Sequence, residues 1–312
     1  ILLLMLLSVG LPFFVLSATS ILLQTWFAHT GHPSARDPYF LYSASNLGSM
    51  LALIGYPTLI EPYFRLADQG RAWTGGYALL LACIVSCAAL TRKYLADTEG
   101  MATDADLTEV NSAQLTLKER SRWVLLAFVP SSLMLGVTTF LSTDVAAIPL
   151  FWVIPLSLYL LTFIIVFARV SPLVHKFMVA LLPICVTTLI FITFSNTGSP
   201  KWLIFIVHLI NFFVYSMVCH GDIAQSRPAP RHLTEFYLLI SLGGVLGGIF
   251  NALIAPVTFN TVLEYPLILV LGALLLPVLN PRPNRRNWRN GILYLAVPVL
   301  LALLTYWFTN KL

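Results

Sequence analysis

The sequence is poor in charge. Only 10% of its 312 residues are Asp, Glu, Lys or Arg, whereas 58% are hydrophobic. A soluble globular domain carries roughly a quarter charged residues, and it has no means of burying so much apolar surface. The composition therefore excludes an ordinary soluble catalytic domain. It indicates a membrane protein, with the lipid bilayer as an expected partner.

The sequence also lacks the residue clusters of a metal, redox or catalytic site. All four cysteines lie within apolar runs, where packing is a more frequent role than a disulfide framework. Cys83 and Cys87 are one helical turn apart, but no His or second cysteine pair accompanies them, so we expect no metal and no cofactor. None of the 13 acids lies near the middle of an apolar run. We therefore expect no catalytic site within this chain.

Apolar runs long enough to cross a bilayer dominate what is present. A hydrocarbon core of roughly 30 Å needs about 20 residues of helix. The sequence predicts a transmembrane bundle of ten helices, with a solvated segment before and after most of them. The predicted spans are residues 1–27, 39–60, 72–90, 123–141, 149–167, 177–194, 202–219, 233–255, 262–279 and 291–308.

The basic residues predict the orientation of these spans. Of the 18 Lys and Arg residues, all but Arg65, Arg71, Lys201 and Lys311 fall on one side of the predicted spans. Cytoplasmic loops carry the excess of basic residues, so that side is predicted to face the cytoplasm of a bacterial inner membrane. The net charge of +5 therefore belongs to loops and does not indicate nucleic-acid binding.

A shift of 199 residues aligns the chain with itself. It places Phe13, Phe14, Val15 and Ser17 on Phe212, Phe213, Val214 and Ser216, and it places Leu47, Gly48 and Pro57 on Leu246, Gly247 and Pro256. Copies that lie six helices apart have the same orientation, which is the parallel arrangement of the two halves of major facilitator transporters. Chance similarity between apolar segments is the alternative explanation.

Several blocks resemble the membrane portion of the bacterial fused major-facilitator/spermidine-synthase family. They are GLPFFVLSATSILLQTWF at 10–27, SARDPYFLYSASNLGSMLALIGYPTLIEP at 34–62, TDVAAIPLFWVIPLSLYLLTF at 143–163, and HLTEFYLLISLGGVLGGIFNALIAPVTFNTVLEYP at 232–266. The resemblance implies about three further helices upstream and a fused soluble domain, similar to aminopropyltransferases, downstream. Both would lie outside this chain, which begins within an apolar segment and without Met.

The resemblance and the internal repeat together predict a domain organisation. Residues 1–90 end the first half with three helices, and residues 91–121 form a central cytoplasmic loop. Residues 122–280 form the second half with six helices, and residues 281–312 add a loop and one more helix.

A cluster of glycines lies within one predicted span and has the spacing of helix contacts. Gly243, Gly244, Gly247 and Gly248 form two overlapping pairs with four-residue spacing, and Gly48 belongs to the matching span. Small residues at this spacing let helices approach closely in lipid, so we expect helix packing here. A phosphate cradle would need a strand before the glycines, which is not predicted.

Polar residues inside the spans are the candidates for function, because their burial in a bilayer is costly. They form stripes on the repeated helices, which either line a central cavity between the halves or pack helices together. The predicted cavity residues are Gln24, Asn46, His208, Asn211, Tyr215 and Asn251.

Three charged residues lie at the predicted cytoplasmic span ends. Asp37 and Glu235 are expected either to complement helix starts or to form a gate with Arg36 across the repeat interface.

Three function classes remain open at this stage. The first is a transporter-like module for a small-molecule substrate, a cationic metabolite such as a polyamine. The second is an anchor for the fused soluble domain, and the third is a scaffold for other membrane proteins. The fold alone does not choose between them.

Overall fold

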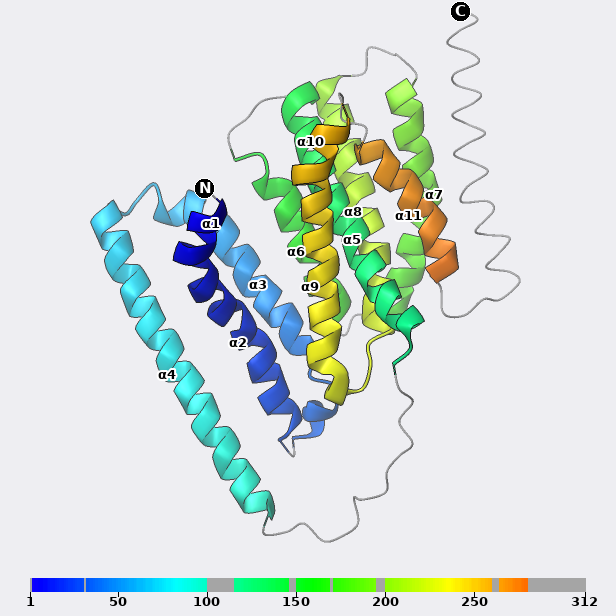
Figure 1. The fold of residues 1–312 in the computed structure, drawn as a ribbon. Coiled ribbons are helices and arrows are strands. Elements are labelled where there is room, and N and C mark those ends of the chain that lie inside the picture. Colours follow the sequence, from blue (N-terminus) through cyan, green and yellow to red (C-terminus); the bar gives the residue numbers. More distant parts are fainter. Residues whose placement is uncertain are drawn as a thin grey trace, which may run out of the picture. The chain divides into compact units, whose positions relative to one another are not determined.

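The computed structural model describes residues 2–30, 32–99, 115–145, 150–168, 171–194, 200–259 and 264–279. Within these residues the chain forms helices joined by short connections, and it contains no strand (Figure 1). The predicted all-α class is therefore confirmed for the described part of the chain. The predicted tenth span, residues 291–308, lies outside it.

The chain divides into two compact units. The first unit comprises residues 1–116 and 228–237, and the second comprises residues 117–227 and 238–312. In the first unit, a nearly continuous helix is built from α1 (Leu2–Met5), the π-helical turn η1 (Leu6–Gly10) and α2 (Leu11–Ala28). The remaining elements are η2 (Pro33–Arg36), α3 (Phe40–Gly55) with η3 (Tyr56–Ile60), α4 (Leu66–Glu99) and η5 (Pro230–His232).

The second unit is organised around one long helix, α8 (Lys201–Gln225). Three helices pack on it, namely α5 (Leu117–Phe140) with its extension η4 (Leu141–Val145), α6 (Val153–Phe167) and α7 (Pro172–Phe194). The helix α11 (Glu264–Leu279) packs on α5. The helix α9 (Leu233–Ile249) begins within the first unit and runs on through η6 (Phe250–Ile254) and α10 (Ala255–Thr258) in the second.

Five helical segments of the described residues are long and apolar enough to cross a membrane. They are Leu66–Tyr94, Leu117–Thr143, Pro172–Leu189, Lys201–Gln225 and Pro230–Thr258. Phe13–Ala28 and Val153–Phe167 are apolar but shorter. The helix of α3 and η3 is not among the five, and it carries Ser43, Asn46 and Ser49 within its length. The chain is thus a multi-pass helical protein of membrane type.

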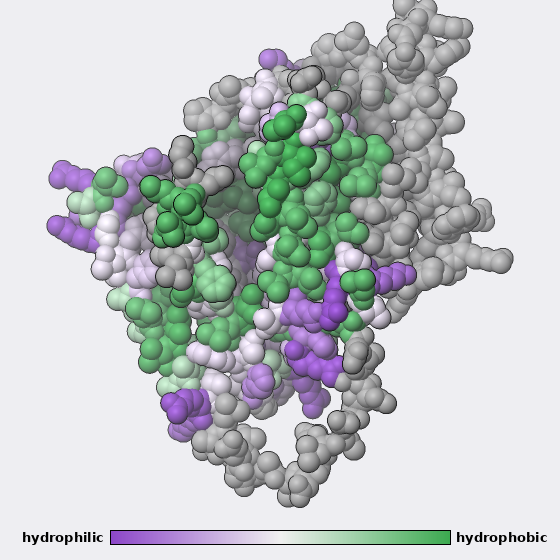
Figure 2. Space-filling view, viewed as in Figure 1, coloured by the Kyte–Doolittle hydropathy of each residue, from purple (hydrophilic) through white to green (hydrophobic). Residues whose placement is uncertain are grey.

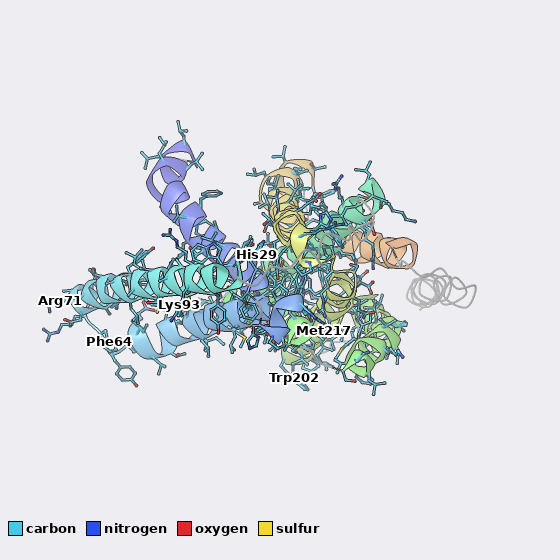
Figure 3. All side chains as sticks on the ribbon, turned by 90° about the horizontal axis from the view of Figure 1, so that it is seen from below. His29, Phe64, Arg71, Lys93, Trp202 and Met217 are labelled. Atoms are coloured by element: carbon cyan, nitrogen blue, oxygen red, sulfur yellow. The ribbon has the colours of Figure 1, made fainter. Side chains whose placement is uncertain are left out.

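The surfaces of the helices fit this character. Figure 2 shows hydrophobic residues along the visible lengths of the helices and hydrophilic residues gathered near their ends. None of the most apolar stretch of α4 is buried within the protein. Arg71 and Lys93 lie far apart along this helix (Figure 3), so the apolar stretch between them is left for lipid.

Several threonine hydroxyl groups in the apolar helices are satisfied locally. Thr25, Thr138 and Thr188 each donate to the backbone carbonyl four residues earlier. Such bonds let a helix carry Ser and Thr in lipid without leaving a polar group unpaired.

The helix boundaries differ from the predicted spans where a helix continues into polar sequence. The helix α4 begins at Leu66 and ends at Glu99, well beyond the predicted 72–90, and α8 continues to Gln225 instead of ending at residue 219. Arg, Lys, Leu, Ala and Glu in residues 91–99 favour helix as strongly as apolar residues do. The predicted central loop is therefore partly helix, and residues 100–114 of it lie outside the described part.

At only one of the two overlapping glycine pairs would an added Cβ meet another helix. A Cβ added to Gly243 would clash with the carbonyl oxygen of Val124 in α5, and one added to Gly247 would lie 2.8 Å from the carbonyl oxygen of Phe128. The helices α9 and α5 thus approach backbone to backbone at these glycines, and Ser131 donates to the carbonyl of Gly244 at 2.8 Å.

The other three glycines do not show this close approach, and their role in packing stays a prediction. A Cβ on Gly48, Gly244 or Gly248 would meet nothing within 4 Å. The physical reason is the 100° step of the helix, which turns Gly244 and Gly248 away from the face that carries Gly243 and Gly247. A sequence with glycines at adjacent positions does not say which pair is in contact.

The two helices matched by the internal repeat share one local feature. The π-helical turn η3 contains Pro57, and the π-helical turn η6 comes just before Pro256. Proline removes a backbone donor, which favours such an irregular turn in a helix.

Candidate functional site

The first unit holds a buried cluster of polar and aromatic side chains. The hydroxyl of Tyr237 donates to Oε1 of Gln24 at 2.8 Å, and the two residues are only 2% and 1% exposed. Tyr42 packs on Tyr237 with ring centroids 4.7 Å apart. Nδ2 of Asn46 donates to the carbonyl of Tyr42 at 2.8 Å. Gln24 and Asn46, two predicted cavity residues, thus belong to one cluster whose amide groups already have protein partners.

The same cluster extends toward the end of α3 that faces the predicted cytoplasmic side. Tyr39 donates to the carbonyl of Pro228 at 2.9 Å and makes an edge contact with Phe236, at a centroid distance of 5.5 Å. Aromatic edge contacts and a satisfied hydroxyl make this a packed part of the unit.

The predicted gate residues lie in the first unit but do not form the predicted pair. Within the described residues Arg36 has no ion-pair partner, whereas Glu235 lies in the first turn of α9 with an oxygen 3.7 Å from Nδ1 of His232. Asp37 directly follows η2 and comes three residues before α3. The gate between Arg36 and Glu235 is therefore not formed in this structure, because Arg36 turns to an open hollow.

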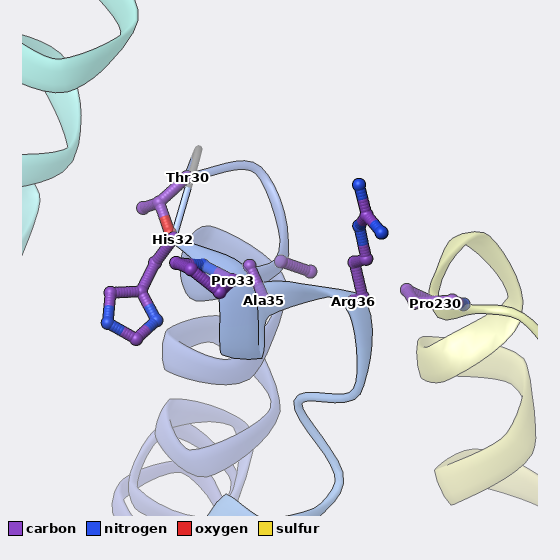
Figure 4. Close-up of a pocket in the computed structure, with 7 residues that line it drawn as sticks. Thr30, His32, Pro33, Ala35, Arg36 and Pro230 are labelled. Atoms are coloured by element: carbon purple, nitrogen blue, oxygen red, sulfur yellow. The ribbon is translucent and has the colours of Figure 1, made fainter.

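This hollow is shown in Figure 4 and has a volume of about 660 Å³. The Arg36 side chain extends away from η2 (Figure 4). The lining residues are Ala28, Thr30, His32, Pro33, Ala35, Arg36 and Pro230.

In the second unit, two of the predicted cavity residues pair with the neighbouring helix α11. His208, 2% exposed, lies with Nδ1 3.0 Å from the hydroxyl of Tyr265 and stacks on Phe140 at 4.4 Å. Tyr215, fully buried, donates to the carbonyl of Leu269 at 2.9 Å. A Cβ on Gly272 would lie 2.6 Å from this hydroxyl, so the glycine makes room for it.

A third predicted residue on the same helix is left without any partner. Asn211 is 0% exposed, and in the described part of the chain neither its Oδ1 nor its Nδ2 has a hydrogen bond. Its neighbours in the sequence of α8, Ile210 and Phe212, are apolar. A buried carboxamide with both ends unpaired is rare in folded proteins and points to a missing partner.

Asn251 is partly satisfied. Its Nδ2 lies at hydrogen-bonding distance from the Ser132 hydroxyl and 3.0 Å from the carbonyl of Gly247, while its Oδ1 is buried and unpaired. Two carboxamide oxygens of the second unit, on Asn211 and Asn251, are thus acceptors without a donor.

Sequence reasoning missed His220, which the structure places in the core of the second unit. Its ring is fully buried, stacks on Phe163 at 3.7 Å, and has Nδ1 2.8 Å from the Thr162 hydroxyl. The Nε2 atom has no partner, and neither does the hydroxyl of the nearby helix residue Ser216. The available signal was the position of His220 on α8 beyond the predicted end of the span at residue 219.

The described residues contain no group of three or more His, Cys, Asp or Glu side chains that could hold a metal ion. Cys185 and Cys219 are buried and unpaired, and Cys83 and Cys87 are exposed and unpaired.

The prediction that all six polar residues line one cavity remains a prediction. Gln24 and Asn46 belong to the first unit, whereas His208, Asn211, Tyr215 and Asn251 belong to the second. Within each unit the structure shows the hydrogen-bond partners of these side chains.

Comparison of the chain with protein-family models, with curated protein sequences and with solved structures gives no match.

Proposed function

We propose that this chain is a transporter-like membrane module that binds a small polar molecule beside α8. The observation that carries the proposal is Asn211, which is 0% exposed and has no partner for either amide atom. Polar groups inside membrane spans are expensive and are retained where a substrate or ion pathway needs them. A bound molecule with a donor for Oδ1 and an acceptor for Nδ2 would remove the cost of the unpaired carboxamide.

The unpaired acceptors indicate the chemistry of the ligand. Oδ1 of Asn211 and Oδ1 of Asn251 both lack a donor. An amine or ammonium group donates two or three N–H bonds, so a small cationic metabolite such as a polyamine suits these oxygens.

The resemblance to the fused major-facilitator/spermidine-synthase family agrees with this proposal but does not carry it. We propose on that basis a bacterial inner-membrane location, a parallel internal repeat, and a fused aminopropyltransferase-like domain in the complete protein. The π-helical turns beside the matched prolines support the repeat.

A second candidate function, an anchor for a fused soluble domain, has its own support. In the first unit the buried Gln24 already pairs with Tyr237, so a ligand is not needed there. An anchor requires only a stable bundle and no unsatisfied polar group.

Uptake of labelled spermidine into proteoliposomes that contain the full-length protein tests the choice. We expect uptake by the wild type, and its loss in Asn211→Leu while the variant stays folded and inserted. Gln24→Leu is the matched control, since it removes an amide that the protein itself satisfies. Spermidine should also raise the melting temperature of the wild type but not that of Asn211→Leu. Equal stabilisation of both proteins, without uptake, would favour the anchor.

A further inference from the structure

A second cavity lies at the ends of three helices in the second unit. It has a volume of about 340 Å³ and lies where α6 ends, α7 begins and α8 ends. Residues of all three helices and of the segments beside them line it, among them Ile165, Val166, Ser171, His175, Met217 and Arg227. Pockets of a few hundred Å³ with a mostly apolar lining and a few polar groups are typical of small-ligand sites.

The cavity is amphipathic. Its apolar wall is formed by side chains of all three helices, among them Ile165, Val174 and Met217. Its polar groups include Ser171, Gln225 and Arg227, all close to helix ends. A ligand with an apolar body and a polar head matches this division.

A histidine is fixed at the boundary between the two parts. Nε2 of His175 lies 3.1 Å from Oδ1 of Asp222, and its Nδ1 is buried against Gly221. Any side chain at position 221 would clash with that nitrogen, so glycine is required for the contact. The ring of His175 is thus held as part of a preformed wall.

The charges around the cavity favour an anionic head. Asp222 is compensated from two sides, since His175 contacts it and Arg122 of α5 attracts it electrostatically. Asp222 itself is not part of the lining, whereas Arg227 is. Arg227 is thus a cationic side chain that a ligand in the cavity would meet.

The location favours a lipid as the source of that head. The basic residues Lys176, Arg227 and Arg231 belong to the side that the charge distribution predicts to be cytoplasmic. Basic pockets between helix ends at this level meet the phosphates of anionic lipids in the inner leaflet. An acyl chain then continues along the apolar wall.

We infer that this cavity binds the phosphate head of an anionic phospholipid, with Arg227, Gln225 and Ser171 around the phosphate and with Ile165, Val166 and Met217 along the chain. This site is separate from Asn211 and does not depend on which molecule the module transports.

Thermal unfolding of the full chain in detergent, with added lipid, tests the site. Phosphatidylglycerol should raise the melting temperature of the wild type, and phosphatidylcholine or inorganic phosphate should not. Arg227→Gln should lose most of the phosphatidylglycerol shift, and Arg227→Lys should keep part of it. The matched control is Lys176→Gln. Lys176 lies near the start of α7 but does not line the cavity, so this variant should keep the full shift.

The loss of Arg227 could itself change the stability of the protein, so a second variant that keeps Arg227 is needed. Val166→Phe narrows the cavity at its apolar wall without changing the charge. This variant should also lose the melting-temperature shift with phosphatidylglycerol. An equal shift with inorganic phosphate would overturn the lipid assignment, and an equal loss in Lys176→Gln would reduce the effect to general surface charge. Native mass spectrometry should show one retained phosphatidylglycerol on the wild type, and its persistence on both Arg227→Gln and Val166→Phe would place the lipid elsewhere.

Discussion

The buried side-chain amides Gln24 and Asn46 of the first unit differ from Asn211 of the second unit in their hydrogen bonds. In the first unit Gln24 accepts from Tyr237, and Asn46 donates to the carbonyl of Tyr42, so each buried amide has a partner in the protein. In the second unit Asn211 has none, although it is equally buried. A satisfied polar pair stabilises helix packing, whereas an unsatisfied one costs free energy unless something else binds. The difference teaches that a polar stripe on a membrane helix can have a structural or a binding role, and that the two are distinguished by their hydrogen bonds.

The two units also differ at a pair of glycines matched by the repeat. Gly247 lies against the backbone of α5, while its counterpart Gly48 has open space where a side chain would be. Positions that the predicted repeat matches thus have different surroundings.

The largest expected effect on stability tests this difference between Gly247 and Gly48. Gly247→Leu should lower the free energy of unfolding by about 1 to 3 kcal/mol, because the new side chain would press on the carbonyl of Phe128 and on Ser131. Gly48→Leu should change it by less than about 0.5 kcal/mol. Thermal unfolding in detergent measures both. Gly248→Leu, one residue along the same helix, is a further control that should resemble Gly48→Leu, and equal losses in all three variants would show that leucine itself is poorly tolerated.

A smaller effect is expected at the satisfied pair of the first unit. Gln24→Leu leaves the buried Tyr237 hydroxyl without its acceptor and should cost about 1 kcal/mol of unfolding free energy. Tyr237→Phe removes the other partner, and the double variant should cost less than the sum of the two single variants. Additive losses in this cycle would mean that the bond between the two side chains contributes nothing.

The smallest effect is expected at Asn211 in the absence of ligand. Asn211→Leu removes an amide that has no hydrogen bond, so the free energy of unfolding should stay within about 1 kcal/mol of the wild type or rise. The same detergent assay gives the value. A loss as large as that of Gln24→Leu would reveal a partner for Asn211 inside the folded protein, and it would remove the main support for a binding site beside α8.

Much of the fold followed from hydropathy, because a helix that crosses a bilayer must be apolar along about 20 residues. The all-helical class and the approximate positions of α5, α7 and α8 were predicted in this way. The ends of α4 were not, since polar helix formers continue a helix beyond the apolar stretch. The gate between Arg36 and Glu235 was predicted from their positions at span ends, but Glu235 instead lies near His232, which is three residues earlier in the chain.

The sequence by itself determined that this is a membrane protein of apolar helices with polar residues at specific places along them. It did so because composition and spacing act locally and need no knowledge of neighbouring helices. Only the tertiary structure decided which of those polar residues are satisfied, which glycine pair touches α5, and that His175 rests on Gly221 beside Asp222. These properties depend on the rotation of each helix about its axis and on the groups that face it from helices distant in sequence, and neither is encoded in any single span.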